Sequence, residues 1–220
     1  MTAALTILFR DESLIAVDKP AGLAVHRGWA RERDVAMIRV RDQIGAHVFP
    51  VHRLDRATSG VLLFALSARA AAQVCESFAT GKTEKTYLAL VRGVPPEEIL
   101  VDHPLPPGED PHAPKVSAQT MVFRREVFGR YSLVEARPLT GRLHQVRRHL
   151  KHLSCPLIGD VNYGKGEHNR LFRECHGVHR LFLHATRLRL PHPSLGGQLD
   201  IASPLPAELA AVLQALREGN

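Results

Sequence analysis

The order of apolar and polar positions along the chain predicts many short strands and fewer helices. Two apolar runs, at 7–9 and 14–17, flank a polar stretch and indicate an antiparallel hairpin. The run Val61–Leu66 is short and continuously apolar, which is typical of a strand buried on both faces. Further strands are expected at 86–91, 116–124, 131–137, 181–190 and 198–201, and the last two form a predicted hairpin.

Helical spacing of apolar residues predicts helices in a smaller part of the chain. Ser67 suits an N-cap, the apolar residues after it keep helical spacing as far as Phe78, and Gly81 suits the C-terminal stop. The other expected helices cover 35–44, 143–153 and 208–217.

Turn-forming residues separate these elements. Lys19–Gly22 predicts a turn, and 23–26 predicts another short strand or a loop. Prolines cluster between 95 and 114, which indicates a surface loop or a hairpin excursion. Because strands predominate and do not alternate with helices, we predict a single α+β domain over 1–220, with a mixed, largely antiparallel sheet and flanking helices.

Composition narrows the class of protein without naming a function. The chain has 220 residues, 45% hydrophobic and 23% charged, which is ordinary for a folded protein with a sizeable core. No apolar run approaches the roughly 20 residues of a membrane helix, and the first residues do not resemble a signal peptide. The three cysteines form no CxxC motif, so a disulfide scaffold is not expected and a cytoplasmic location is.

The net charge indicates a class of binding partner, which the overall composition does not. Lys and Arg number 29 against 22 Asp and Glu, so the net charge is +7, and the isoelectric point is about 9.8. A basic domain favours a polyanionic partner, most often a nucleic acid, although many small basic proteins have none.

The first candidate site is the segment His52–Gly60, which comes directly before the most apolar strand. Basic residues surround one carboxylate, Asp55, and small polar residues follow. Nearby cations favour the charged form of Asp55, so the loop could hold an ionised carboxylate beside a phosphate-bearing ligand. The alternative is a solvated connector with a surface ion pair of little energetic value.

The second candidate site is the basic segment 140–152, in which helical geometry separates two faces. Its apolar residues share one face, whereas His144, Arg148, Lys151 and His152 lie opposite, where solvent or phosphate can meet them. Arg147 lies at the border of the apolar stripe. Its guanidinium stays charged and either pairs with a carboxylate, for which Asp55 is the natural candidate, or extends past the core into water.

The remaining candidate residues and motifs give weaker evidence of a functional site. Tyr87, between strand residues, is either a core residue with a satisfied hydroxyl or part of the Asp55 site if its ring faces that way. The histidines and cysteines near 144–155 and 175–184 match no metal-ligand spacing, so no metal site is expected. Neither a GxGxxG motif nor a P-loop occurs, so no nucleotide cofactor is expected.

Several motifs, in one order along the chain, resemble the signatures of the RluA family of pseudouridine synthases. The resemblance spans roughly residues 5 to 205. The motifs are Val17–Gly22, His52–Gly60, Lys85–Gly93, Thr140–Arg147, Pro156–Asp160 and Leu183–Ala185. Segments 25–29, 40–45 and 47–49 are similar to a tRNA-specific member of that family.

This resemblance implies the catalytic fold of that family without an S4-type domain, and an isomerase that turns a uridine of RNA into pseudouridine without cofactor or metal. The implied catalytic residues are Asp55, Tyr87 and Arg147. Asp55 either attacks covalently or removes the sugar proton at C2′, Arg147 orients it, and Tyr87 contacts the uracil and takes the C5 proton. The implied substrate-binding residues are Arg53, His52, Arg142, His144 and Leu183.

The implied substrate is tRNA, at the T-stem uridine conventionally numbered 65, with rRNA or a non-catalytic RNA-binding role as the alternatives. The target base must flip out of its stack, and Arg53 is the residue expected to enter the RNA. Aromatic residues make up only 5% of the chain, which favours recognition of folded RNA by phosphates, 2′-hydroxyls and shape. We expect a monomer with no membrane partner. Trp29 either touches RNA or caps the core.

Overall fold

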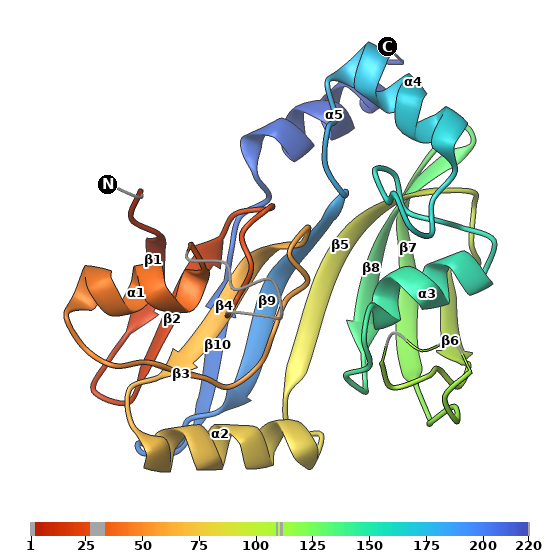
Figure 1. The fold of residues 1–220 in the computed structure, drawn as a ribbon. Coiled ribbons are helices and arrows are strands. Elements are labelled where there is room, and N and C mark those ends of the chain that lie inside the picture. The colour runs from red at the N-terminus through yellow and green to blue at the C-terminus, as the bar shows by residue number, and fades with distance from the viewer. Residues whose placement is uncertain (1–2, 27–33, 109, 111, 220) are drawn as a thin grey trace. The chain divides into compact units, whose positions relative to one another are not determined.

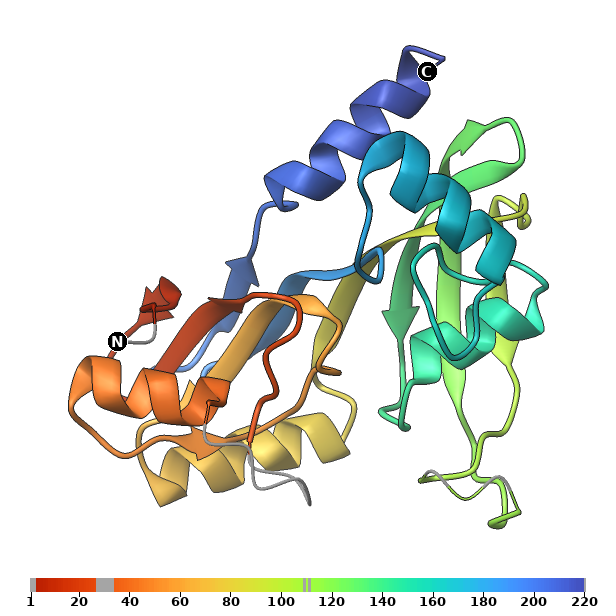
Figure 2. The same cartoon turned by 45° about the horizontal axis from the view of Figure 1, so that its top comes forward.

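The computed structural model describes residues 3–26, 34–108, 110 and 112–219. These residues form two compact units (Figures 1 and 2). Unit 1 comprises Met1–Glu84 with Ala185–Pro204, and unit 2 comprises Lys85–His184 with Leu205–Asn220. Trp29 lies outside the described residues.

Unit 1 contains a sheet with the strand order β1-β2-β4-β9, with β3 paired to β4 and β10 to β9. The pairs β1–β2, β2–β4, β3–β4 and β9–β10 are antiparallel. α2 packs against β3 and β4, and α1 lies beside β1 and β2 (Figure 1). The elements are β1 Thr6–Arg10, β2 Leu14–Lys19, α1 Ala36–Ile44, β3 Phe49–Pro50, β4 Ser59–Ala65, α2 Ala68–Ala79, β9 Leu183–Pro191 and β10 Gln198–Ala202.

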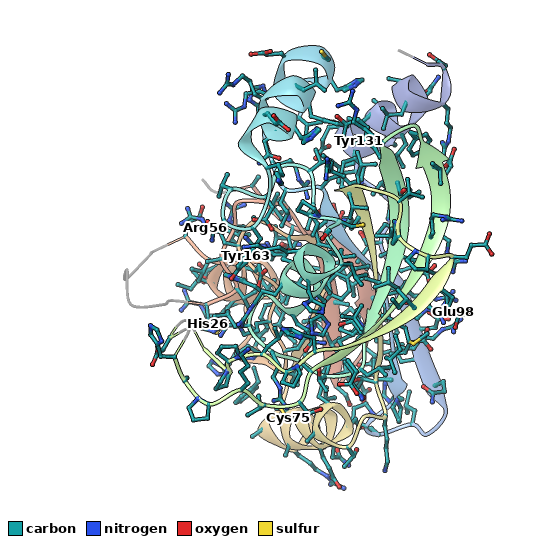
Figure 3. All side chains as sticks on the ribbon, turned by 90° about the vertical axis from the view of Figure 1, so that its right-hand side faces the viewer. His26, Arg56, Cys75, Glu98, Tyr131 and Tyr163 are labelled. Carbon is teal, nitrogen blue, oxygen red and sulfur yellow. The ribbon has the colours of Figure 1, made fainter. Side chains whose placement is uncertain are left out.

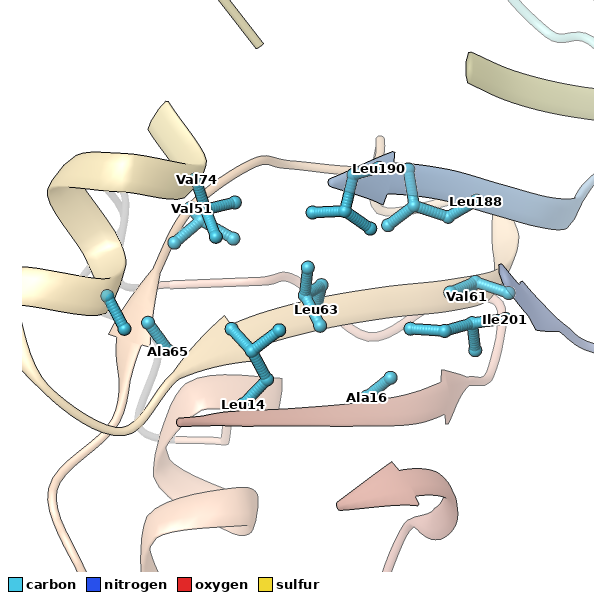
Figure 4. Packing of buried hydrophobic residues seen from close by; sticks show 11 residues of the cluster. Leu14, Ala16, Val51, Val61, Leu63, Ala65, Val74, Leu188, Leu190 and Ile201 are labelled. Carbon is cyan, nitrogen blue, oxygen red and sulfur yellow. The ribbon is translucent and has the colours of Figure 1, made fainter. Parts of the chain in front are cut away.

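The core of unit 1 is built around β4, in which every residue is buried. Leu63 lies at its centre, with Val74 of α2, Leu188 and Leu190 of β9 and Leu14 of β2 around it (Figure 4). A strand covered on both faces must be apolar on both faces, which explains why this run shows no alternation. α2 begins where Ser67 accepts a hydrogen bond from the amide of Ala70 at 3.2 Å, as an N-cap should.

Unit 2 contains an antiparallel sheet of order β5-β8-β7-β6. Its elements are β5 Glu84–Arg92, β6 Glu98–Asp102, β7 Gln119–Phe128, β8 Tyr131–Pro138, α3 Gln145–His152, α4 Gly166–His176 and α5 Ala207–Arg217. α3 lies across β7 and β8 (Figures 1 and 2). α4 and α5 contribute Phe172, Leu209 and Val212 to a second core, which also includes Leu90 and Leu133.

The predicted fold class and most predicted elements are confirmed. The structure settles two alternatives and adds one helix to the sequence reading. The proline-rich segment 95–114 is a hairpin excursion, because it contains strand β6, which pairs antiparallel with β7. Helix α4 was not predicted. Most of its residues are polar, and only His168 and Phe172 are buried, so its sequence has no apolar stripe. The stretch 23–26 is a loop with a single isolated bridge, from Ala24 to Val35. No helix of the described chain has the length and apolarity to cross a membrane.

Candidate active site

Asp55 lies in the loop between β3 and β4 of unit 1. The amide of Thr58 donates to the carbonyl of Asp55 at 3.0 Å and closes a tight turn. Leu54 and Thr58 are buried on either side of it, so the half-buried Asp55 is held at a fixed point of the loop. Gly60 follows at φ +115°, and a Cβ there would lie 2.2 Å from the carbonyl oxygen of Ala185. Only glycine therefore allows β4 to leave this loop so close to β9.

Lys19 fixes the Asp55 loop from inside the protein. Its side chain is fully buried, and Nζ donates to the carbonyl oxygens of Pro20 at 2.9 Å, Leu23 at 2.8 Å and Arg56 at 3.2 Å. The carbonyl of Arg56 also accepts from the amide of Gly22 at 2.8 Å, and Arg56 Nε donates back to the carbonyl of Gly22 at 2.9 Å. The turn after β2 and the Asp55 loop are therefore one hydrogen-bonded body. Sequence reasoning assigned Lys19 only to a turn.

The neighbours of Asp55 in its motif have different environments. His52 Nε2 accepts from the amide of Leu63 at 2.9 Å, and its ring stacks on Phe78 at 5.2 Å between centroids. His52 thus ties the loop to β4 and α2. Arg53 is exposed, and its contact with RNA stays a prediction. Leu183, at the start of β9 in unit 2, is buried at 3% exposure.

Tyr87 lies on β5 in unit 2, directly opposite Ala136 of β8, and its side chain is half-buried. Lys85 precedes it by two residues and therefore projects from the same face of the strand. Lys85 Nζ donates to the carbonyl of Thr140 at 3.1 Å, in the loop that leads into α3. Burial lowers the pKa of Lys85 to about 8, because the charged ammonium loses solvation there.

Arg147, on α3 of unit 2, forms a buried ion pair with Asp160. Arg147 Nε donates to Oδ2 at 2.8 Å and Nη2 donates to Oδ1 at 2.9 Å. The amides of Asn162 and Tyr163 each donate to Oδ1 at 3.0 Å. Although burial raises the pKa of Asp160, the Arg147 hydrogen bonds and charge and the two amides outweigh it, so this pKa lies below its usual value.

The Arg147–Asp160 pair decides between the two alternatives for Arg147 and adds Asp160 to the candidate site. Arg147 is only 5% exposed, so the interpretation in which it extends into water is wrong. The expectation that a buried guanidinium requires a carboxylate is confirmed, and Asp160 is one such partner of Arg147. Asp160 ends the motif Pro156–Asp160, for which the sequence predicts no role. An aspartate shortly after a basic helix is the sequence signal that points to it. A pairing of Arg147 with Asp55 stays a prediction.

The other residues of 140–152 take up different positions. His144 adopts the left-handed conformation at φ 52°, so α3 begins at Gln145, and its Nδ1 lies 3.2 Å from the hydroxyl of Tyr163. Arg142 Nε donates to the carbonyl of Ser117 at 3.0 Å. Lys151 and His152 are exposed as predicted.

His149, by contrast, is fully buried on α3. Its ring nitrogens lie 2.9 Å from Thr120 Oγ1 and 3.0 Å from the carbonyl of His103. Within the part of the chain that the structure describes, no group of three or more His, Cys, Asp or Glu side chains could hold a metal ion.

Comparison with known proteins identifies the family. A sequence model described as RNA pseudouridylate synthase matches residues 13–152, a stretch that includes Asp55, Tyr87 and Arg147. The chain belongs to the RNA pseudouridylate synthase family. It is therefore a pseudouridine synthase, an isomerase, as its motifs indicate.

Relatives and solved structures of this family resemble the chain over most of its length. It is 45% identical to tRNA pseudouridine synthase C of Vibrio parahaemolyticus, over 89% of this chain and 88% of that protein. It is 46% identical to the protein of that name from Vibrio cholerae, over 86% of each. The structure of Human RNA Pseudouridylate Synthase Domain Containing 4 superposes with a TM-score of 0.78 at 31% identity, covering 96% of this chain and 93% of that one.

Proposed function

We propose that this synthase isomerises a uridine of tRNA, the T-stem uridine numbered 65, with Asp55 as its catalytic carboxylate. The observation that carries the proposal is the 45% and 46% sequence identity, over 89% and 86% of the chain, to proteins named tRNA pseudouridine synthase C. The bond from Lys19 to the carbonyl of Arg56, which fixes the Asp55 loop, supports it. A fixed carboxylate supports catalysis because it needs little reorganisation when the substrate binds.

The proposed reaction exchanges one glycosidic bond for another. The N1–C1′ bond breaks, the uracil turns while it is held, C5 bonds to C1′, and the C5 proton is lost while N1 gains one. The exchange involves neither net oxidation nor hydrolysis. Asp55 acts in its ionised form, either by attacking the sugar or by taking the C2′ proton.

Arg147 and Tyr87 complete the proposed catalytic group. Asp160 anchors the guanidinium of Arg147 through two hydrogen bonds, and we infer that Arg147 in turn pairs with Asp55 and orients it. Tyr87 contacts the uracil and takes the C5 proton. A water-poor site also keeps the detached base from escaping.

The remaining residues of the site act on the RNA. The target nucleotide must leave its stack, and the exposed Arg53, two residues before Asp55, enters the space it vacates. His52 serves mainly through its bond to Leu63, which places Arg53 and Asp55. Arg142, His144 and Leu183 of unit 2 also contribute to substrate binding in this proposal.

The test uses unmodified tRNA transcripts, purified protein and chelator. Pseudouridine is mapped by chemical adducts that stop primer extension, for wild type and for Asp55→Asn, which removes the charge at nearly constant volume. One T-stem pseudouridine that disappears in the variant supports substrate, position and carboxylate together. Product in rRNA fragments alone supports the rRNA alternative. Binding without product from any RNA supports the non-catalytic role and overturns the proposal.

A further inference from the structure

A basic hollow of about 370 Å³ lies on unit 2 beside α3, outside the catalytic residues proposed above. Its lining combines cationic and imidazole side chains with an apolar wall and one tyrosine. The lining residues are His103, Pro104, Leu105, Pro106, Lys115, Arg148, Lys151, His152 and Tyr163. None of the described residues that line the hollow is an Asp or a Glu, so this lining presents positive charge.

The wall of the hollow is held rigidly against α3. Leu105 and Val116 exchange backbone hydrogen bonds at 3.0 and 2.9 Å, which continues the β6–β7 pairing outward. Arg148 Nη1 donates to the carbonyl of Pro106 at 3.0 Å, and His149 binds the carbonyl of His103. Hydrogen bonds therefore attach residues 103–106, which form the wall, both to α3 and to Val116.

Tyr163 connects this hollow to Arg147. Its ring centroid lies 5.7 Å from Lys151 Nζ, inside the hollow, and 5.1 Å from the guanidinium carbon of Arg147. Figure 3 shows Tyr163 next to α3, whereas Tyr131 lies nearer α4 and α5. A ligand in the hollow would thus be separated from Arg147 by one aromatic ring.

We propose that the hollow binds a phosphodiester group of the RNA backbone close to the target nucleotide. The inference rests on the proposed function, because it takes RNA as the substrate. Lys115 and Lys151 supply mobile ammonium groups, which suit phosphate as point charges, and Pro104 to Pro106 offer an apolar surface for a ribose. His103 and His152 stack at 3.8 Å between centroids and add donors when protonated.

The test measures binding separately from turnover. In an Asp55→Asn background, affinity for an unmodified tRNA transcript is measured over a series of KCl concentrations. Lys115→Gln with Lys151→Gln removes two exposed charges of the hollow. Lys82→Gln with Arg173→Gln, also exposed, removes two charges elsewhere and is the matched control. Each lost phosphate contact lowers the salt slope by about 0.7 to 0.9.

We expect the hollow variant to bind about tenfold more weakly at low salt, with a salt slope reduced by about one, and the control to change little. Equal losses in both variants would mean a general charge effect, and unchanged binding in the hollow variant would also overturn the inference. With Asp55 restored, the hollow variant should reach the wild-type single-turnover rate at higher enzyme concentration. Absence of pseudouridine from the wild type would overturn the proposed function but not the binding result.

Discussion

The carboxylate of Asp160 holds the guanidinium of Arg147 through two parallel hydrogen bonds, and the backbone amides of Asn162 and Tyr163 hold the carboxylate. This arrangement fixes both the position and the rotation of the guanidinium, which one hydrogen bond would not do. The position of the Arg147 guanidinium therefore depends on the loop after α3, which carries Asp160, as well as on the helix.

Asp160→Asn should destabilise the protein and slow catalysis. The substitution removes the charge of Asp160 from the buried Arg147, and broken buried pairs lose about 3 kcal/mol or more. We expect that loss in the free energy of unfolding by urea denaturation, and at least a tenfold fall in single-turnover rate with unchanged tRNA affinity. Asp200→Asn is the control, because Asp200 pairs with Arg187 and Arg189 at the surface, where loss should stay below about 1 kcal/mol. An equal loss in both variants would contradict the assigned role.

Gly60→Ala should be far more damaging than its size suggests. The new Cβ would lie 2.2 Å from the carbonyl oxygen of Ala185, at a φ of +115° that disfavours side chains. Backbone strain and overpacking together predict a loss of about 3 kcal/mol or more. Gly45→Ala has a positive φ of 67° but no atom within 4 Å of the added Cβ, so about 1 kcal/mol is expected. Similar losses at the two positions would show that the contact with Ala185 does not matter.

His149 should make stability fall as the solution becomes acidic. Burial lowers the pKa of this imidazole in the folded protein, with smaller contributions from the nearby His103, His152 and Arg148, while its hydrogen bond to His103 opposes the shift. The unfolded chain therefore takes up a proton near pH 6.5 that the folded chain does not, and stability present above this pH is lost below it.

Urea denaturation at pH 7.5, 6.5 and 5.5 measures this effect. His149→Gln can keep hydrogen bonds to Thr120 and the His103 carbonyl, so we expect a shallower pH dependence rather than collapse. The exposed His179→Gln is the control and should keep the wild-type dependence. An unchanged dependence in His149→Gln would assign the effect to other groups.

Binding of tRNA should strengthen as pH falls from 7.5 to 6. Burial lowers the pKa of His103, and the stacked His152 and the nearby Lys115 and Arg148 lower it further. A bound phosphate favours the protonated imidazole, so binding and proton uptake are linked, and affinity rises as protons become available. Titrations of the Asp55→Asn protein at each pH measure the slope, which His103→Gln with His152→Gln should reduce. An equal slope in that variant would remove the histidine pair from the mechanism.

The elements that sequence could predict are those whose signal is local. The buried run at β4, the Ser67 cap and the β9–β10 hairpin follow from periodicity and turn residues alone. Helix α4 could not be predicted in this way, because it packs on a core that segments distant in sequence form together.

The same limit applies to the site. Motif order identified Asp55, Tyr87 and Arg147 as candidates. The bond from Lys19 to the carbonyl of Arg56 spans 37 residues, and Asp160 reaches Arg147 from a loop whose path the apolar pattern does not predict.

Lys19 occupies the place that a bound cation holds in many loops. Its ammonium gathers three carbonyl oxygens as an ion would, yet it is attached to the chain by its own side chain. A free ion has an affinity and an off-rate, so its loop is ordered only at sufficient ion concentration. The ammonium of Lys19 is covalently attached and has neither. The shape of the Asp55 loop therefore does not depend on the concentration of any ion in solution.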